Sequence, residues 1–236
     1  MEFTAAAPAY SFTVQNGATF TITGGTINNS SFAPAFTVNA GSALTLGDGA
    51  FVEMGSLAGG GTVTIGPSSS STQLSIVGPG STTFSGTLTG AGTLELDNGT
   101  LTLTGLGSNI GGLNICNCDT NGLIISGGSL NVTDPGLGTV VEGGTLSVIN
   151  GGTLQTTNLA VVISSAMLIS GPGSTVTVSP TGLTEIAALV GPASLTIANG
   201  GVLTSLGGAA LDSGSPNFAS TVTVTGPARL GTPVRA

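Results

Sequence analysis

Apolar and polar residues alternate along most of this chain in short stretches. Thr-Val-Thr-Val at 175–178 and 221–224 and Leu-Thr-Leu-Thr at 101–104 show the pattern most clearly. A period of two is typical of a strand with one buried face. Because glycine interrupts every candidate helix at short intervals, we predict an all-β protein built from short strands.

One phrase recurs along the chain: two apolar residues separated by one position, followed a few residues later by glycine. It begins at positions 12, 36, 63, 94, 123, 146, 168, 195 and 222, at intervals of 22 to 31 residues. Recurrence at such a period indicates a repeat architecture. Asn-Gly pairs between the strands supply the positive φ that tight corners need.

These repeats predict a parallel β-solenoid of about nine or ten coils, with aliphatic side chains inside and Thr and Ser outside. We expect residues 1–11 to form an N-terminal cap or a short start introduced in cloning. Residues 12–236 are then one solenoid, a fragment of a longer one. A β-sandwich also has short alternating strands and is the alternative fold, but the recurring glycine phrase favours the solenoid.

Composition narrows the function classes. The 236 residues include 41 glycines, no His and only two basic residues, Arg229 and Arg235, for a net charge of −8. Without a basic patch we expect no nucleic-acid partner, and without His the commonest general base is missing. No apolar run approaches the ~18 residues of a membrane helix, so we expect no membrane insertion of this segment. No cofactor is predicted.

Cys116 and Cys118 form the motif Cys-Asn-Cys. We expect either a tight local disulfide in an exported protein or two buried thiols. A redox or metal pair is the functional alternative, although a zinc site needs about four ligands and the chain has no His.

Several repeats resemble those of bacterial autotransporter passenger domains. The resemblance is carried by Leu-Ser-Val-Ile-Asn-Gly-Gly-Thr-Leu at 146–154, by Leu-Thr-Ile-Ala-Asn-Gly-Gly-Val-Leu at 195–203, and by the Gly-Pro-Gly-Ser-Thr phrases at 78–82 and 171–175. It implies a right-handed parallel β-helix displayed outside a Gram-negative cell, and hence an extracellular or outer-surface location.

Two patterns suggest catalysis, and neither is complete. Asp212-Ser213-Gly214-Ser215-Pro216 resembles the nucleophile phrase of serine-protease autotransporters, but that mechanism needs a His base. We expect a turn there. Glu95 and Asp97 alternate onto one strand face and could form the carboxylate pair of a glycoside hydrolase. We nevertheless expect no catalytic residues and a protein that is not an enzyme.

Calcium is the metal to consider for the acidic residues. Oxygen ligands of the kind calcium prefers occur in one stretch of the chain, at Glu95, Asp97, Asn98 and Asp119. The Gly-Gly-x-Gly-x-Asp repeat of calcium-binding β-rolls is missing, so these residues are candidates only, and the prediction is no metal.

Threonines form the candidate contact surface. A self-association face is predicted from Thr100, Thr102, Thr104, Thr175, Thr177, Thr221, Thr223 and Thr225. Threonine arrays also occur on ice-binding solenoids, where nearly every coil carries a pair. The units at 123, 146 and 168 begin with Leu-Ile-Ile, Leu-Ser-Val and Leu-Ile-Ser instead, which argues against ice binding.

The function predicted from the sequence is a non-catalytic surface protein, adhesin-like or self-associating. The expected partners are further copies of the rod, side to side or head to tail, and a host or surface ligand. One alternative is a passive spacer that presents another domain. Another is a carbohydrate-active enzyme built on the same β-helix.

Overall fold

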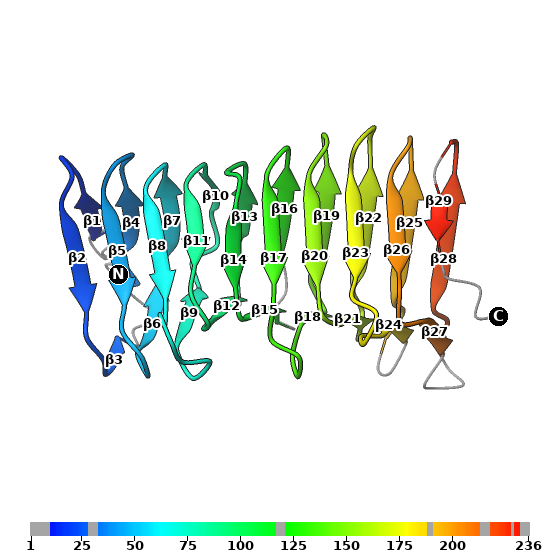
Figure 1. Cartoon of the computed structure of the whole chain (residues 1–236), viewed down its shortest axis with the longest axis horizontal. Coiled ribbons are helices and arrows are strands. Elements are labelled where there is room, and N and C mark those ends of the chain that lie inside the picture. The colour runs from blue at the N-terminus through cyan, green and yellow to red at the C-terminus, as the bar shows by residue number, and fades with distance from the viewer. Residues whose placement is uncertain are drawn as a thin grey trace, which may run out of the picture.

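In a computed structural model the chain is an elongated all-β solenoid of about nine turns. The structure describes residues 10–27, 33–116, 121–187, 191–212, 218–227 and 229–231, and contains no helix among them. The strands descend on the near side in Figure 1 and rise on the far side while the chain advances along the rod, which makes the solenoid right-handed. This hand is the usual one for parallel crossovers.

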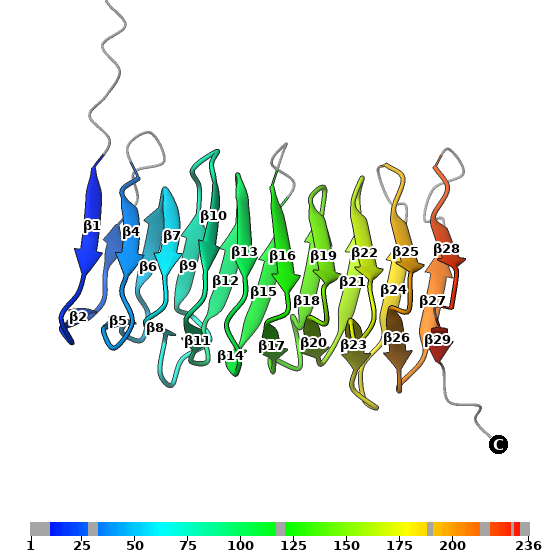
Figure 2. The ribbon, with the colours of Figure 1, turned by 90° about the horizontal axis from the view of Figure 1, so that it is seen from above.

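Each coil contributes strands to three parallel sheets that run the length of the rod (Figure 2). The first sheet contains β1 (Ser11–Val14), β4 (Ala35–Val38), β7 (Ser56–Gly59), β10 (Ser81–Phe84), β13 (Thr100–Leu103), β16 (Gly122–Ser126), β19 (Thr145–Ile149), β22 (Ala166–Ser170), β25 (Ser194–Ala198) and β28 (Thr221–Thr225). The second sheet contains β2 (Thr19–Ile22), β5 (Ala43–Leu46), β8 (Thr62–Ile65), β11 (Thr87–Thr89), β14 (Ser108–Ile110), β17 (Ser129–Val132), β20 (Thr153–Thr156), β23 (Thr175–Val178), β26 (Val202–Ser205) and β29 (Arg229–Gly231). The third sheet contains β3 (Thr26–Ile27), β6 (Phe51–Met54), β9 (Gln73–Ile76), β12 (Thr93–Leu96), β15 (Gly112–Ile115), β18 (Thr139–Glu142), β21 (Leu159–Val162), β24 (Thr184–Ala187) and β27 (Ala209–Asp212).

The predicted parallel β-helix is therefore confirmed, and the β-sandwich alternative is wrong. Every strand pair in the described part of the chain is parallel and joins one coil to the next. Residues with the same role thus stack in ladders along the axis. Leu44, Val63 and Leu88 form one such ladder, in register and fully buried. Close-packed aliphatic ladders of this kind supply most of the core of the rod.

Asn-Gly corners connect the first sheet to the second, as the sequence predicts. Asn16, Asn150 and Asn199 have φ values of 60°, 54° and 51°, and each is followed by a glycine of positive φ. The Asn150 side-chain amide donates a hydrogen bond of 3.0 Å to the Ser126 hydroxyl of the preceding coil. The asparagine thus both adopts the left-handed conformation and ties the corner to its neighbour.

Some inward positions hold hydroxyl groups, and these are paired. The Thr139 hydroxyl donates to that of Thr156 at 3.0 Å, and Thr184 donates to Ser205 at 2.9 Å. All four residues are buried. Because each of these four hydroxyls has a partner, these polar positions interrupt the aliphatic core at little cost.

The coils differ from the predicted repeat in one region. The phrases that begin at 63 and 94 lie in the second and third sheets, so they do not mark the starts of coils. In register, the first sheet instead passes from Phe36 through Leu57, Thr82 and Leu101 to Leu123. The chain completes one more coil here than the repeat predicted, because strands of all three sheets share the same alternation.

The two ends of the described chain are less covered than its middle. Val224 and Leu230, in the last coil, are each 46% exposed, whereas Leu203 in the coil before is 1% exposed. At the other end Phe12 packs against Phe20 and Phe36, with ring centroids 4.5 Å and 5.3 Å apart. Strand β1 begins at Ser11. Residues 1–9 lie outside the described residues, so the predicted cap stays a prediction.

Candidate functional site

Two acidic residues and a cysteine lie together on the outer face of the third sheet. Glu95 belongs to β12, Asp97 follows that strand directly, and Cys116 follows β15 on the next coil. One ligand atom from each, two carboxylate oxygens and a sulfur, can be chosen so that all lie within 4.8 Å of one another. The alternation of Glu95 and Asp97 predicted their shared face, whereas the approach of Cys116 depends on the coil register.

Side chains from neighbouring coils orient both carboxylates. The Asn114 amide donates a hydrogen bond of 3.1 Å to Oε1 of Glu95, and the Gln73 amide donates to Oε2. The Ser75 hydroxyl donates to Asp97. Asn114 lies on the coil after Glu95 in the chain, and Gln73 and Ser75 lie on the coil before. The geometry of the pair is thus fixed by the stacking of three coils.

The electrostatics of this cluster disfavour charge on Glu95. Burial is the main factor that raises the pKa of Glu95 above its ordinary value. The negative charge of Asp97 raises this pKa further, the hydrogen bond from Asn114 lowers it, and the charge of Glu53 raises it. Desolvation and like charges both disfavour the ionised form of a carboxyl group. An added positive charge would therefore have a large effect here.

The backbone beneath the cluster is anchored by one buried side chain. Asn121 is 3% exposed, and its amide donates hydrogen bonds of 2.6 Å to the carbonyl oxygens of both Leu96 and Cys116. These carbonyls lie at the ends of the two strands that carry the acidic pair and the cysteine. Asn121 thereby fixes the spacing between Asp97 and Cys116.

A small cleft of about 260 Å³ opens beside Glu95. Its walls are Gln73, Thr93, Glu95 and Asn114, with Leu137 and residues 70–72 at the rim. Asp97 does not line it. Glycoside hydrolysis needs two carboxyl groups on opposite sides of the bound sugar, and this cleft has one. The geometry gives no support to the carbohydrate-active alternative.

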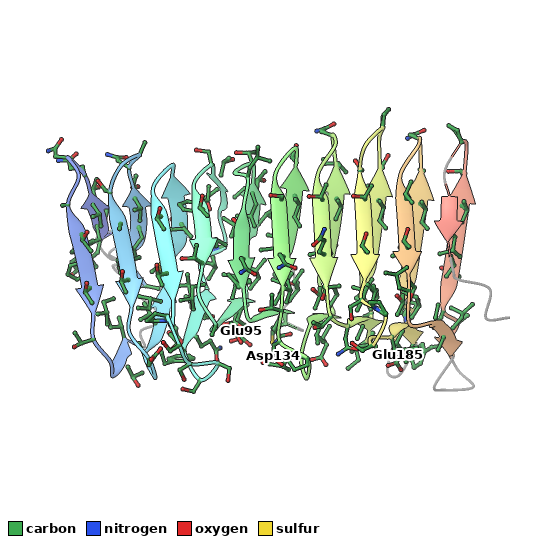
Figure 3. The ribbon with its side chains drawn as sticks, in the orientation of Figure 1. Glu95, Asp134 and Glu185 are labelled. Carbon is green, nitrogen blue, oxygen red and sulfur yellow. The ribbon has the colours of Figure 1, made fainter. Side chains whose placement is uncertain are left out.

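Asn98, another calcium candidate, has a structural role in its turn, and so has the acidic residue Asp134, which was not a candidate. The Asn98 side-chain oxygen accepts the Gly99 N–H at 2.8 Å, within its own turn. Asp134 accepts the N–H groups of Gly136 and Leu137 at 2.7 Å and 3.1 Å. Figure 3 shows Glu95, Asp134 and Glu185 along the same side of the rod, that of the third sheet.

Three predictions fall on residues that the structure does not describe. Asp119 and Cys118 lie within 117–120, so the fourth calcium candidate and the Cys116–Cys118 disulfide stay predictions. Asp212, the first residue of the serine phrase, ends β27, and the rest of the phrase, 213–216, is likewise outside the described ranges, so the predicted turn stays a prediction.

The threonines of the predicted self-association face occupy two sheets. The first sheet holds Thr100, Thr102, Thr221, Thr223 and Thr225, and Thr104 follows its strand β13. Thr175 and Thr177 lie in β23 of the second sheet. The eight residues therefore do not form a single face.

From β2 to β26 the second sheet carries an unbroken outward row of uncharged polar side chains, which the sequence reasoning missed and which ends at Gly231 in β29. In register, this row contains Thr21, Thr45, Thr64, Thr89, Asn109, Asn131, Gln155, Thr177 and Thr204. We call it the second-sheet row. Strands β2 to β26 of this sheet contain no charged residue. In the sequence, each member of the row appears only as a Thr, Asn or Gln between two apolar residues. The register between coils is needed to show that these residues stack into one row.

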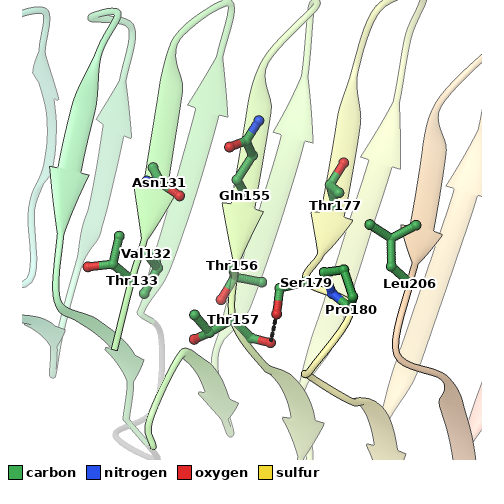
Figure 4. A pocket seen from close by; sticks show the side chains of 10 residues that line it. All are labelled: Asn131, Val132, Thr133, Gln155, Thr156, Thr157, Thr177, Ser179, Pro180 and Leu206. Atoms are coloured by element: carbon green, nitrogen blue, oxygen red, sulfur yellow. Dashed lines mark hydrogen bonds between the residues drawn. The ribbon is translucent and has the colours of Figure 1, made fainter. Parts of the chain in front are cut away.

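A depression of about 350 Å³ lies beside the second-sheet row. Figure 4 shows Asn131, Gln155 and Thr177 on successive strands above it. Its lower edge includes Ser179, whose hydroxyl donates a hydrogen bond of 3.3 Å to the Thr157 carbonyl. The row therefore borders a shallow, uncharged hollow.

The corresponding row of the first sheet is interrupted by apolar residues. In register, it contains Thr13, Thr37, Ala58, Thr83, Thr102, Ile124, Ser147, Leu168, Thr196 and Thr223. Ala58, Ile124 and Leu168 cannot donate or accept hydrogen bonds through their side chains. The second sheet is the more uniform polar surface of the two.

Comparison with known proteins finds no matching family model, no matching curated protein and no matching solved structure. Within the described residues, no helix has the length and apolar character needed to cross a bilayer. The fold itself defines the class, a β-solenoid repeat protein.

Proposed function

We propose that this protein is a non-catalytic structural rod that self-associates through its second sheet. The unbroken second-sheet row is the observation that carries the proposal. Hydroxyl and amide groups both donate and accept hydrogen bonds. A row on one rod can therefore bond to the same row on another. Because strands β2 to β26 carry no charge, the contact involves no direct repulsion between like charges.

The outer surface of a Gram-negative cell is the proposed location. The likeness of residues 146–154 and 195–203 to autotransporter passenger repeats supports it. At that surface the same face would also act as an adhesin, binding a host or surface ligand with repeated polar groups. A passive spacer remains the rival, and it differs in having no association of its own.

Ionic strength provides a test of self-association. The chain carries a net charge of −8, so two copies repel each other at long range. In 0.1 M salt this repulsion is largely screened beyond a distance of about 10 Å. We expect sedimentation velocity to show larger species as protein concentration and salt rise. An elongated monomer that does not change with either would contradict self-association and favour the spacer.

Charge variants locate the contact. Gln155→Glu places a negative charge in the second-sheet row, whereas Ser147→Glu adds the same charge to the first sheet. We expect Gln155→Glu to weaken association markedly and Ser147→Glu to change it little. Equal effects of the two substitutions would show that net charge, and not the second sheet, governs association.

Adsorption to ice is a second candidate, favoured by threonine pairs on one sheet. The pairs 19/21, 62/64, 87/89 and 175/177 all lie on strands of the second sheet. The units at 123, 146 and 168, whose sequences argued against ice binding, belong to the first sheet. That argument therefore does not concern the second sheet, although β5, β14, β17, β20 and β26 of this sheet also lack such a threonine pair. Asn and Gln replace Thr at Asn109, Asn131 and Gln155.

Thermal hysteresis decides this candidate. An ice-binding face predicts a measurable hysteresis that Thr64→Lys on the second sheet abolishes and Thr102→Lys on the first sheet preserves. Wild-type protein without hysteresis or ice shaping at high concentration would exclude ice as the ligand.

A further inference from the structure

The cluster on the third sheet has negative charge, and no strand next to it in the described part of the chain carries a cation. The chain has no Lys and no His, and its only Arg residues are Arg229 and Arg235. Arg229 belongs to β29, the last strand of the second sheet, whereas β12 is the fourth of the nine strands of the third sheet. Buried charges in proteins are paired or coordinate metal ions. A bound cation would balance the negative charge of the carboxylates around Glu95.

Two buried acceptor atoms beside the cluster lack a hydrogen-bond donor among the described residues. Glu53 is 9% exposed and its Oε2 has no partner. It lies in the same outward row as Glu95, with Ser75 between them, and its charge acts on Glu95. The Oδ1 atom of Asn114 is also buried and without a donor, although the amide of the same side chain bonds Glu95. A cation bound near Glu95 would offset the repulsion that the Asp97 and Glu53 carboxylates exert on Glu95.

We propose that Glu95, Asp97 and Cys116 bind a divalent cation, with zinc preferred over calcium. Zinc accepts carboxylate oxygen and thiolate sulfur together, whereas calcium takes oxygen ligands. Tetrahedral zinc ligands stand roughly 3.5 Å apart when bond lengths are about 2.0–2.3 Å. The three ligand atoms already lie within 4.8 Å of one another. Rotation of the three side chains would move their ligand atoms closer by the remaining distance of about 1 Å. Water or the Asn114 Oδ1 atom would provide a fourth ligand.

Second-layer contacts for such a site are already present. Gln73 and Asn114 bond Glu95, and Ser75 bonds Asp97. Hydrogen bonds of this kind orient metal-ligating carboxylates. Asn121 holds the backbone of both ligand-bearing strands. This inference concerns a different sheet from the proposed self-association face and stands independently of it.

Cobalt provides the spectroscopic test on the full-length chain. The protein is reduced, freed of metal with a chelator and titrated with Co²⁺. We expect one equivalent to bind with a thiolate-to-cobalt charge-transfer band, and Zn²⁺ but not Ca²⁺ to displace it. Cys116→Ser should abolish the band and Cys118→Ser should preserve it.

Carboxylate variants test the remaining ligands. We expect Glu95→Gln and Asp97→Asn each to weaken Co²⁺ and Zn²⁺ binding at least about 10-fold. Glu185→Gln is the matched control, because Glu185 lies in the same outward row of the third sheet on β24. It should bind as the wild type does. Circular dichroism confirms that each variant keeps its strand content.

Four results would overturn the proposal. They are the lack of a charge-transfer band in the wild type, a band that survives Cys116→Ser, displacement of cobalt by calcium, and equal losses in Glu95→Gln and Glu185→Gln. Mass spectrometry of the unreduced native protein provides a fifth test. A Cys116–Cys118 disulfide there would remove the thiolate and with it the zinc site.

Discussion

The hydroxyl oxygens of Thr64 and Thr89 lie 3.1 Å apart, on neighbouring strands of the second sheet. This bond joins two members of the second-sheet row across one coil step. Asn131 and Asn109 repeat the relationship further along, where the amide of one donates to the side-chain oxygen of the other at 3.1 Å. Neighbouring members of the row are thus hydrogen-bonded to each other within a single rod.

A double-mutant cycle measures the value of the Thr64–Thr89 bond. Thr64→Val and Thr89→Val each remove a hydroxyl and keep the branched shape, so each should lower the free energy of unfolding by about 0.5–1.5 kcal/mol. The second substitution should add little once the first is made. Additive losses in denaturant unfolding would show that the two hydroxyls do not interact.

Removing a large side chain from the middle of the core should be costly. Phe84 is fully buried in β10, and Phe84→Ala is expected to lower the free energy of unfolding by about 3–5 kcal/mol. Val224→Ala, at a side chain 46% exposed in the last coil, should cost less than about 1 kcal/mol. Hydrogen exchange should place the damage of Phe84→Ala in the adjoining coils, and uniform loss of protection along the rod would contradict that.

The glycines at the corners differ in what a side chain would meet. Gly90 has a φ of +115°, and a Cβ there would overlap the carbonyl oxygen of Ile65 on the preceding coil. Gly17 has a φ of +74° with nothing within 4 Å of the added carbon. Gly17→Ala should cost about 1–2 kcal/mol through backbone strain alone, and Gly90→Ala at least about 2 kcal/mol more. Equal losses in thermal unfolding would show that the overlap is relieved by backbone movement.

The raised pKa of Glu95 makes stability depend on pH in the metal-free protein. The folded state holds the Glu95 proton more tightly than the unfolded chain, whose pKa is near the ordinary 4.5. Stability should therefore fall as pH rises from 4.5 through the raised pKa. Glu95→Gln should remove this loss, so the variant gains stability above that window and little below it. Denaturant unfolding across the range tests this, and a wild type whose stability rises through the window would contradict it.

Alternation and corner residues were enough to predict the fold. A period of two with Asn-Gly at the turns identified short strands, and their recurrence identified a solenoid. The sequence alone did not allow strands to be assigned to sheets. The phrases that begin at Val63 and Leu94 have the same pattern as the phrase at Phe36, although only Phe36 belongs to the first sheet. Corners and loops of unequal length between strands hide the register, and one coil was missed for that reason.

The third-sheet cluster was predictable only within one strand. Glu95 and Asp97 share a face because they are two residues apart. Cys116 joins them only because Leu96 pairs with Ile115 on the next coil. The burial of Glu53 likewise results from packing between coils, and the residues next to it in the sequence do not predict it. Contacts between coils depend on register, and a single sequence does not state it.

Stacking of the coils only upon their neighbours gives the rod a mechanical character. Each sheet joins a strand to the corresponding strand one coil away, so no bond spans the length of the molecule. A pull on the two ends of the chain would load the terminal coils first, beginning with the poorly covered one around Val224. We expect such a rod to lengthen by peeling coil after coil at similar force. It would behave as an extensible tether rather than a rigid strut.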